Sequence, residues 1–146
     1  FKKFIILLAL VAAFPASLLR ADPESRPAGI AARIWAVGNI TSGQPGDLSL
    51  SGTYLHPDPS VGGTQYRSAS TSTSSGGTLT TNLGTATNSI VRVEPGKVYQ
   101  LIVGGQNLGS TQIYIIPPPG YRTLIDGIVR TSFAFSGGYL FYFQLE

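Results

Sequence analysis

Histidine, serine and carboxylate side chains are the groups in this sequence that could carry out acid–base or nucleophilic chemistry. His56 is the single histidine, and it precedes Pro57 in a stretch that reads as a loop. A serine nucleophile would need His56 as its base. Serine is so abundant that a match to a Ser-His-Asp triad carries no information. We therefore expect His56 to be an ordinary loop residue.

Paired carboxylates and metal ligands are the other routes to catalysis. The acidic residues after position 21 are Asp22, Glu24, Asp47, Asp58, Glu94, Asp126 and Glu146. No two of them share a short motif of the kind that a glycosidase needs for its acid and its base or nucleophile. One histidine and no cysteine exclude zinc-type clusters, and the D-x-D-x-D-G calcium spacing is missing. The sequence predicts no catalytic residue, no metal site and no cofactor, and so a protein that is not an enzyme.

Aromatic rings are the remaining candidates for ligand binding, because sugars stack on exposed rings. Aromatic residues at alternate strand positions belong more often to the core, which is the competing interpretation. Tyr114 and Tyr142 face opposite to their apolar neighbours along the chain, so we expect them to be exposed. With Trp35 they form the predicted ligand-binding set.

The first residues have the pattern of a secretory signal peptide. Lys2 and Lys3 precede an uncharged apolar run from Phe4 to Phe14, which is shorter than the roughly 20 residues that span a bilayer. We predict a signal peptide over 1–21 with cleavage after Ala21, a flexible leader over 22–29 and one domain over 30–146. No stable membrane span is expected after cleavage. The predicted location is secreted, periplasmic or at the cell surface.

Charge and composition narrow the class of protein further. The chain has 10 Lys and Arg against 7 Asp and Glu, and three of these basic residues lie in the predicted signal peptide. The remainder is balanced, so nucleic-acid binding has no electrostatic basis. Cysteine is absent, and an exported domain without disulfides depends on packing and on sheet hydrogen bonds.

Short alternating segments bounded by Gly and Pro predict an all-β, antiparallel sandwich of about nine or ten strands, Ig-like or jelly-roll-like. Strands are expected over 30–37 and 48–55. The Ser/Thr-rich stretch predicts a polar hairpin of strands 65–73 and 77–83 at an exposed sheet edge. A second hairpin, 89–94 with 97–103, is expected to turn at Pro95-Gly96. GGQNLG at 104–109 is interpreted as a hairpin loop and not as a phosphate-binding loop.

The stretch from Ile113 to Arg130 combines three prolines with a glycine and an Asp-Gly pair. Pro117, Pro118 and Pro119 cannot donate ladder hydrogen bonds, and Gly120 allows a sharp redirection. Asp126-Gly127 predicts a two-residue hairpin between 121–125 and 128–133. The last segment, 139–145, places Tyr139, Phe141, Phe143 and Leu145 on one face.

The phrase PPPGYRTLIDGIVR, Pro117 to Arg130, resembles the exported N-terminal β-regions of long bacterial RHS/YD-repeat surface proteins. The resemblance covers 15–35 residues around this phrase, and the Tyr-Asp repeats that define that family are absent, so the repeat shell and toxin functions do not carry over. It implies a bacterial exported scaffold or adhesion module.

Three hypotheses about function follow. The first is a non-catalytic structural or adhesive module of a bacterial cell-surface or secreted protein, with glycans or other surface-protein domains as partners. The second is a carbohydrate-binding module. The third is a self-assembling subunit in which strand 139–145 pairs with a neighbouring chain.

Overall fold

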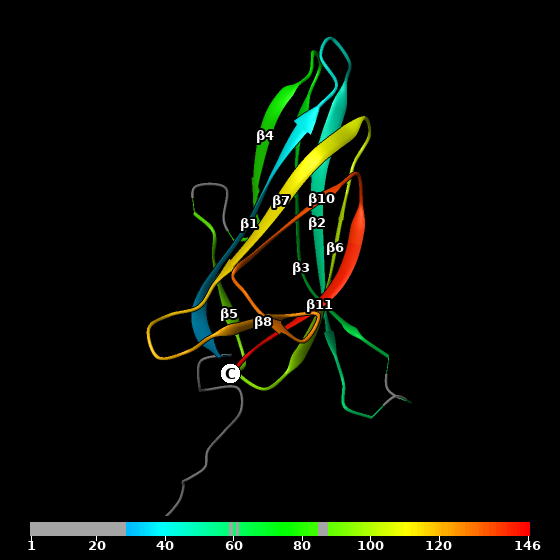
Figure 1. The fold of residues 1–146 in the computed structure, drawn as a ribbon. Helices are drawn as coiled ribbons and strands as arrows, with labels where there is room; N and C mark the ends of the chain where they lie inside the picture. Colours follow the sequence, from blue (N-terminus) through cyan, green and yellow to red (C-terminus); the bar gives the residue numbers. More distant parts are fainter. Residues whose placement is uncertain (1–28, 59, 61, 85–87) are drawn as a thin grey trace, which may run out of the picture.

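The computed structural model describes residues 29–146 except 59, 61 and 85–87, so the predicted signal peptide, its cleavage after Ala21 and most of the leader lie outside the described residues. The described chain is all-β, with eleven strands in two antiparallel sheets that pack against each other (Figure 1). This confirms the predicted β-sandwich. Among the described residues no helix is long and apolar enough to cross a membrane.

The five-stranded sheet is built around its longest strand, β1. Its members are β1 (Ile30–Ile40), β4 (Gly77–Asn82), β5 (Ile90–Val93), β7 (Leu108–Ile116) and β10 (Ser132–Ser136). The order is β10-β7-β1-β4, and β5 pairs with the start of β1 on the side where β4 pairs with its end. The strands β10 and β4 are therefore edges of this sheet.

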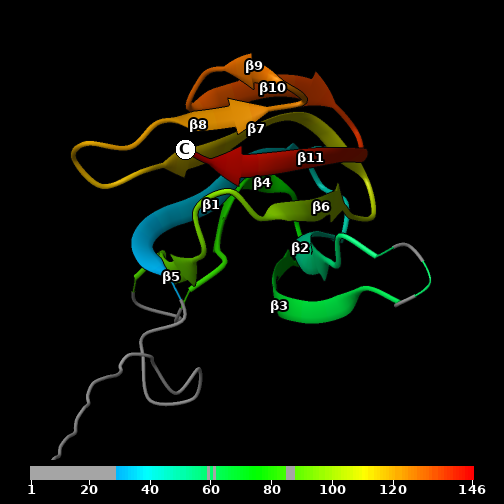
Figure 2. The same ribbon diagram turned by 90° about the horizontal axis from the view of Figure 1, so that it is seen from below.

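The six-stranded sheet has the order β3-β2-β6-β11-β8-β9. Its members are β2 (Gly46–Leu55), β3 (Thr64–Thr73), β6 (Val98–Gly104), β8 (Thr123–Ile125), β9 (Ile128–Val129) and β11 (Tyr139–Leu145). Figure 2 shows β3 on one side of the molecule and β9 on the other. The C-terminal strand β11 is central, with β6 on one side and β8 on the other.

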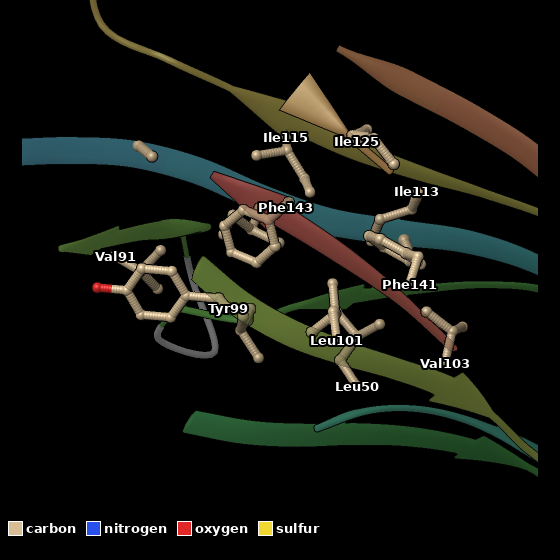
Figure 3. Close-up of a cluster of buried hydrophobic side chains, with 14 of the residues drawn as sticks. Leu50, Val91, Tyr99, Leu101, Val103, Ile113, Ile115, Ile125, Phe141 and Phe143 are labelled. Atoms are coloured by element: carbon tan, nitrogen blue, oxygen red, sulfur yellow. The ribbon is translucent and has the colours of Figure 1, made fainter. Parts of the chain in front are cut away.

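The core lies between the sheets and follows the alternation of apolar residues along each strand. Phe141 and Phe143 of β11 and Leu101 of β6 pack from the six-stranded sheet toward Ile113 and Ile115 of β7 (Figure 3). All five side chains are buried.

The predicted hairpin at Pro95-Gly96 has the right turn but the wrong strand pairing. Lys97 N–H donates to the Glu94 carbonyl at 3.2 Å, and Gly96 has φ 80°. However, β5 pairs with β1 in one sheet, while β6 pairs with β2 and β11 in the other. The turn carries the chain across the sandwich, and the inward side chains of β5 and β6 both belong to the shared core.

The predicted polar hairpin is wrong in the same way. β3 is an edge of the six-stranded sheet and β4 an edge of the five-stranded sheet, so the expected edge position is right but the two strands form no ladder. Side chains join them instead: the Thr71 hydroxyl donates to the Thr80 carbonyl at 3.2 Å, and the buried Thr81 hydroxyl lies 2.9 Å from the Thr71 hydroxyl. The Thr81 hydroxyl also donates to the Leu48 carbonyl of β2 at 2.9 Å. These contacts close one side of the sandwich.

Two further expectations need correction. The loop at 104–109 connects β6 to β7, which lie in different sheets, so it is not a hairpin loop. The predicted strand 128–133 is broken: β9 ends at Val129, and β10 begins at Ser132 in the opposite sheet. In both places the sequence indicates a turn, but it does not indicate that the chain passes to the other sheet there.

Candidate functional site

Tyr142 lies on the outer face of the six-stranded sheet. Its neighbours Phe141 and Phe143 point into the core, whereas the Tyr142 side chain is 43% exposed. Its main chain is fixed by the turn between β8 and β9: Tyr142 N–H donates to Asp126 Oδ1 at 3.0 Å, and Asp126 N–H donates to the Tyr142 carbonyl at 2.8 Å. The ring is therefore held in place while its face stays open to solvent.

A shallow hollow of about 170 Å³ lies beside Tyr142 and is lined by Val98, Leu124, Gly127, Tyr142, Phe143 and Gln144. The Gln100 amide donates to the Tyr142 hydroxyl at 3.5 Å, a long contact that leaves both groups able to bind a ligand. The hollow thus combines apolar residues with the Tyr142 ring and the Gln144 amide, and the Gln100 amide lies beside it at the Tyr142 hydroxyl.

A larger hollow of about 520 Å³ adjoins the first at Val98, and its other lining residues are Leu55, His56, Pro57, Pro95, Gly96 and Lys97. The Lys97 ammonium lies 5.7 Å from the centre of the Tyr54 ring, and the His56 ring meets Tyr54 edge-on at 4.9 Å. The two hollows form one surface with apolar residues along its length and cationic or imidazole groups at one end.

Strand register explains the apolar floor. Leu55 pairs with Val98 across β2 and β6, and Leu124 pairs with Val129 across β8 and β9. Gln144 of β11 pairs with Leu124 and stands next to Val98, because Phe143 pairs with Tyr99 in the ladder of β11 with β6. These residues form one transverse row on the outer face. A little farther along, Ile102 pairs with Leu140, and both are exposed by more than 40%. Clustered exposed apolar side chains of this kind mark interaction sites in soluble proteins.

Trp35 and Tyr114 lie on the outer face of the other sheet, so the structure does not bring them near Tyr142. They are a cross-strand pair between β1 and β7, with ring centres 4.7 Å apart and planes 12° apart. The Arg33 guanidinium lies 4.8 Å from the centre of the Trp35 ring. Both rings are half-buried. One face of each ring is covered by the other ring, so this pair offers a ligand less aromatic surface than Tyr142 does.

The predicted turn residues take different places relative to the hollows. Pro95 and Gly96 line the larger hollow, and Gly127 lines the smaller one. Asp126 and Gly127 have φ values of 52° and 78°, as a type I′ turn requires. The role of Asp126 in holding Tyr142 has no sequence signal beyond this Asp-Gly pair, because the two residues meet only through the pairing of β8 with β11.

The corner at Pro117, Pro118, Pro119 and Gly120 leads from β7 to β8 and therefore from one sheet to the other. Tyr121 N–H donates to the Pro118 carbonyl at 3.2 Å, and Gly120 has φ 90°. Just beyond it, the buried Thr123 hydroxyl donates to the Ile115 carbonyl at 3.0 Å across the sandwich. The corner does not line either hollow, and its contacts are structural.

His56 and Asp58, two of the groups considered for catalysis, make local hydrogen bonds. The His56 ring has its Nε2 3.0 Å from the Thr64 hydroxyl. The Asp58 carboxylate accepts hydrogen bonds from the main chain and the hydroxyl of Ser60, which lower the pKa of Asp58. In the part of the chain that the structure describes, no three His, Cys, Asp or Glu side chains come together as a metal site.

No family model matches the chain, and comparison with curated proteins and with solved structures gives no match either.

Proposed function

We propose that this chain is a non-catalytic β-sandwich module of an exported protein, and that it acts in adhesion at a bacterial cell surface or outside the cell. The observation that carries the proposal is the outer face of the six-stranded sheet. There the exposed ring of Tyr142 stands beside two adjoining hollows with an apolar floor. The signal-peptide pattern and the resemblance to RHS/YD-repeat surface proteins support the exported, bacterial setting.

Carbohydrate is the ligand class that this surface favours, which makes a carbohydrate-binding module the second candidate. A sugar ring presents C–H groups that pack on an aromatic face and hydroxyls that pair with side-chain amides. Tyr142 supplies the ring, and Gln100 and Gln144 supply amides within the same patch. Trp35 and Tyr114 make a weaker case, because they stack on each other.

The third hypothesis, exchange of strand 139–145 between chains, is less favoured. β11 forms ladders with both β6 and β8, and its inward side chains are among the largest in the core. Removing it would break both ladders and open the core.

The test is binding of the folded chain to a glycan array, followed by titration of any glycan that binds. Tyr142→Ala is expected to weaken binding at least about tenfold. Tyr114→Ala, a matched tyrosine on the opposite face, is expected to leave binding unchanged. Equal binding by the unchanged chain and by Tyr142→Ala would remove this surface from the proposal. A folded chain that binds no glycan would contradict the carbohydrate candidate and leave an adhesive role toward other protein domains.

A further inference from the structure

The far side of β10 is an open sheet edge. β10 ends the order of its sheet and pairs only with β7 among the described strands. Ile115 N–H donates to the Thr131 carbonyl, and Gly137 N–H donates to the Gly109 carbonyl, so odd-numbered residues direct their main-chain groups toward β7. The alternation of an antiparallel ladder then directs the main-chain groups of Ser132, Ala134 and Ser136 outward.

Within the described residues, β10 lacks the charges, proline and bulges that usually protect an edge strand against pairing with another chain. Edge strands are commonly blunted by charges, proline or bulges, or covered by other parts of the chain. The sequence of β10 is SFAFS, without charge or proline, and its pairing with β7 has no register shift. The opposite edge, β4, differs because the Thr71 hydroxyl covers its Thr80 carbonyl.

The sequence of β10 is also a palindrome centred on Ala134. When two such strands pair antiparallel with Ala134 opposite Ala134, Ser132 meets Ser136 and Phe133 meets Phe135 at both ends. The outward-facing main-chain groups then come into hydrogen-bonding register, with about six bonds across the pair. A two-fold interface needs a self-complementary surface of this kind.

We propose that the free edge of β10 pairs with the same edge of a second copy of this chain, antiparallel, with Ala134 on the two-fold axis. The five-stranded sheets of the two copies become one continuous sheet. This proposal is independent of the Tyr142 surface, which lies on the outer face of the other sheet.

Exposed apolar side chains lie on the same side of the molecule as β10, and this favours a second copy of the chain as its partner. Figure 2 shows β9 and β10 together on the side away from β3. Ile128 and Val129 of β9 are 55% and 56% exposed. The rings of Phe133 and Phe135 are only partly buried and contact Tyr139, with ring centres 5.1 and 5.4 Å apart. Pairing of β10 would give both phenylalanines a cross-strand aromatic partner.

Arg130, the charged residue nearest to β10 in the sequence, does not oppose this pairing. The Arg130 guanidinium lies 4.3 Å from the centre of the Phe133 ring. Because the two strands run antiparallel, the two copies of Arg130 lie at opposite ends of the interface.

The experiment measures the mass of the full chain by sedimentation over a concentration series up to about 1 mM. The unchanged chain is expected to shift from monomer to dimer. Ala134→Pro removes an outward N–H that the ladder with β7 does not use, which an edge strand tolerates, and it is expected to abolish the dimer. Thr80→Lys on the opposite edge is the matched control and is expected to dimerise as the unchanged chain does.

Charge variants test the register. Ser132→Lys with Ser136→Lys sets like charges opposite each other and is expected to weaken dimerisation at least about tenfold. Ser132→Glu with Ser136→Lys sets opposite charges face to face and is expected to keep the dimer. A monomeric unchanged chain, a double-lysine variant that dimerises normally, or loss of the dimer in both charge variants would overturn the proposal. Emission from Trp35 shows that each variant is folded.

Discussion

At the scale of single residues, exposure of an aromatic ring depends on its cross-strand neighbour. Tyr114 and Tyr142 both alternate with buried residues, and the same reasoning placed both on outer faces. Tyr114 meets Trp35 across the ladder and stacks on it, whereas Tyr142 meets Gln100. Tyr114 also borders a hollow, of about 200 Å³, but one face of its ring is covered by Trp35. Tyr142 lines its hollow without an aromatic ring stacked on it in the described residues.

Tyr66 is a residue whose burial makes a prediction about alkaline pH. Its hydroxyl donates to the Arg92 carbonyl and so ties β3 to β5 in the other sheet. Burial is the main cause that raises the pKa of Tyr66 above its ordinary value of 10.0. The folded state thus keeps the neutral phenol while the unfolded chain ionises, and stability present below pH 10 is lost as the pH rises above it.

Tyr66→Phe is expected to cost about 1 kcal/mol at pH 7, from the lost hydrogen bond, and to weaken the fall in stability above pH 10. Burial also raises the pKa of Tyr99, so part of the alkaline fall is expected to remain. Urea unfolding from pH 7 to pH 11 gives both quantities. Parallel curves for the variant and the unchanged chain would show that Tyr66 does not titrate in this way.

At the scale of elements, the connections decide the architecture. Consecutive strands pair with each other at β2–β3 and at β8–β9, while the connections after β1, β3, β5, β6, β7, β9 and β10 pass from one sheet to the other. Such crossing turns place successive strands face to face across the core. A Pro-Gly or Gly-Gly pair fits a hairpin turn and a crossing turn equally well. Each pair fixes the local direction of the chain and not the partner of the next strand.

Gly96 tests the geometry of one crossing turn. An added Cβ would meet nothing within 4 Å, so only its φ of 80° opposes a side chain. Gly96→Ala is expected to lower the free energy of unfolding by roughly 1–2 kcal/mol. Gly104→Ala is the matched control: its Cβ also meets open space, and its φ lies outside the left-handed region. That change is expected to be neutral or to stabilise by up to about 1 kcal/mol. Equal losses would contradict this account of the turn.

At the scale of the whole molecule, the two sheets share one core. The buried cluster takes Ile34, Ile113 and Ile115 from one sheet and Leu101 and Phe141 from the other. Neither sheet can keep its apolar face buried without the other.

We therefore expect one cooperative unfolding transition. Trp35 is the only tryptophan and reports on the five-stranded sheet, whereas far-UV circular dichroism reports on all strands. The two signals should follow the same curve in urea. An earlier loss of the Trp35 signal would mean that the five-stranded sheet unfolds first.

The amino-acid sequence by itself determined the all-β class, most strand positions, the inward and outward faces of each strand and the residues of the turns. These depend on alternation and on the local conformations of Gly, Pro and Asp, which act within a few residues. The tertiary structure alone decided which sheet each strand joins, and with it the contact of Asp126 with Tyr142, the hollows beside Val98 and the free edge of β10. These depend on pairing between residues far apart in the chain, and an apolar strand face is buried equally well in either sheet.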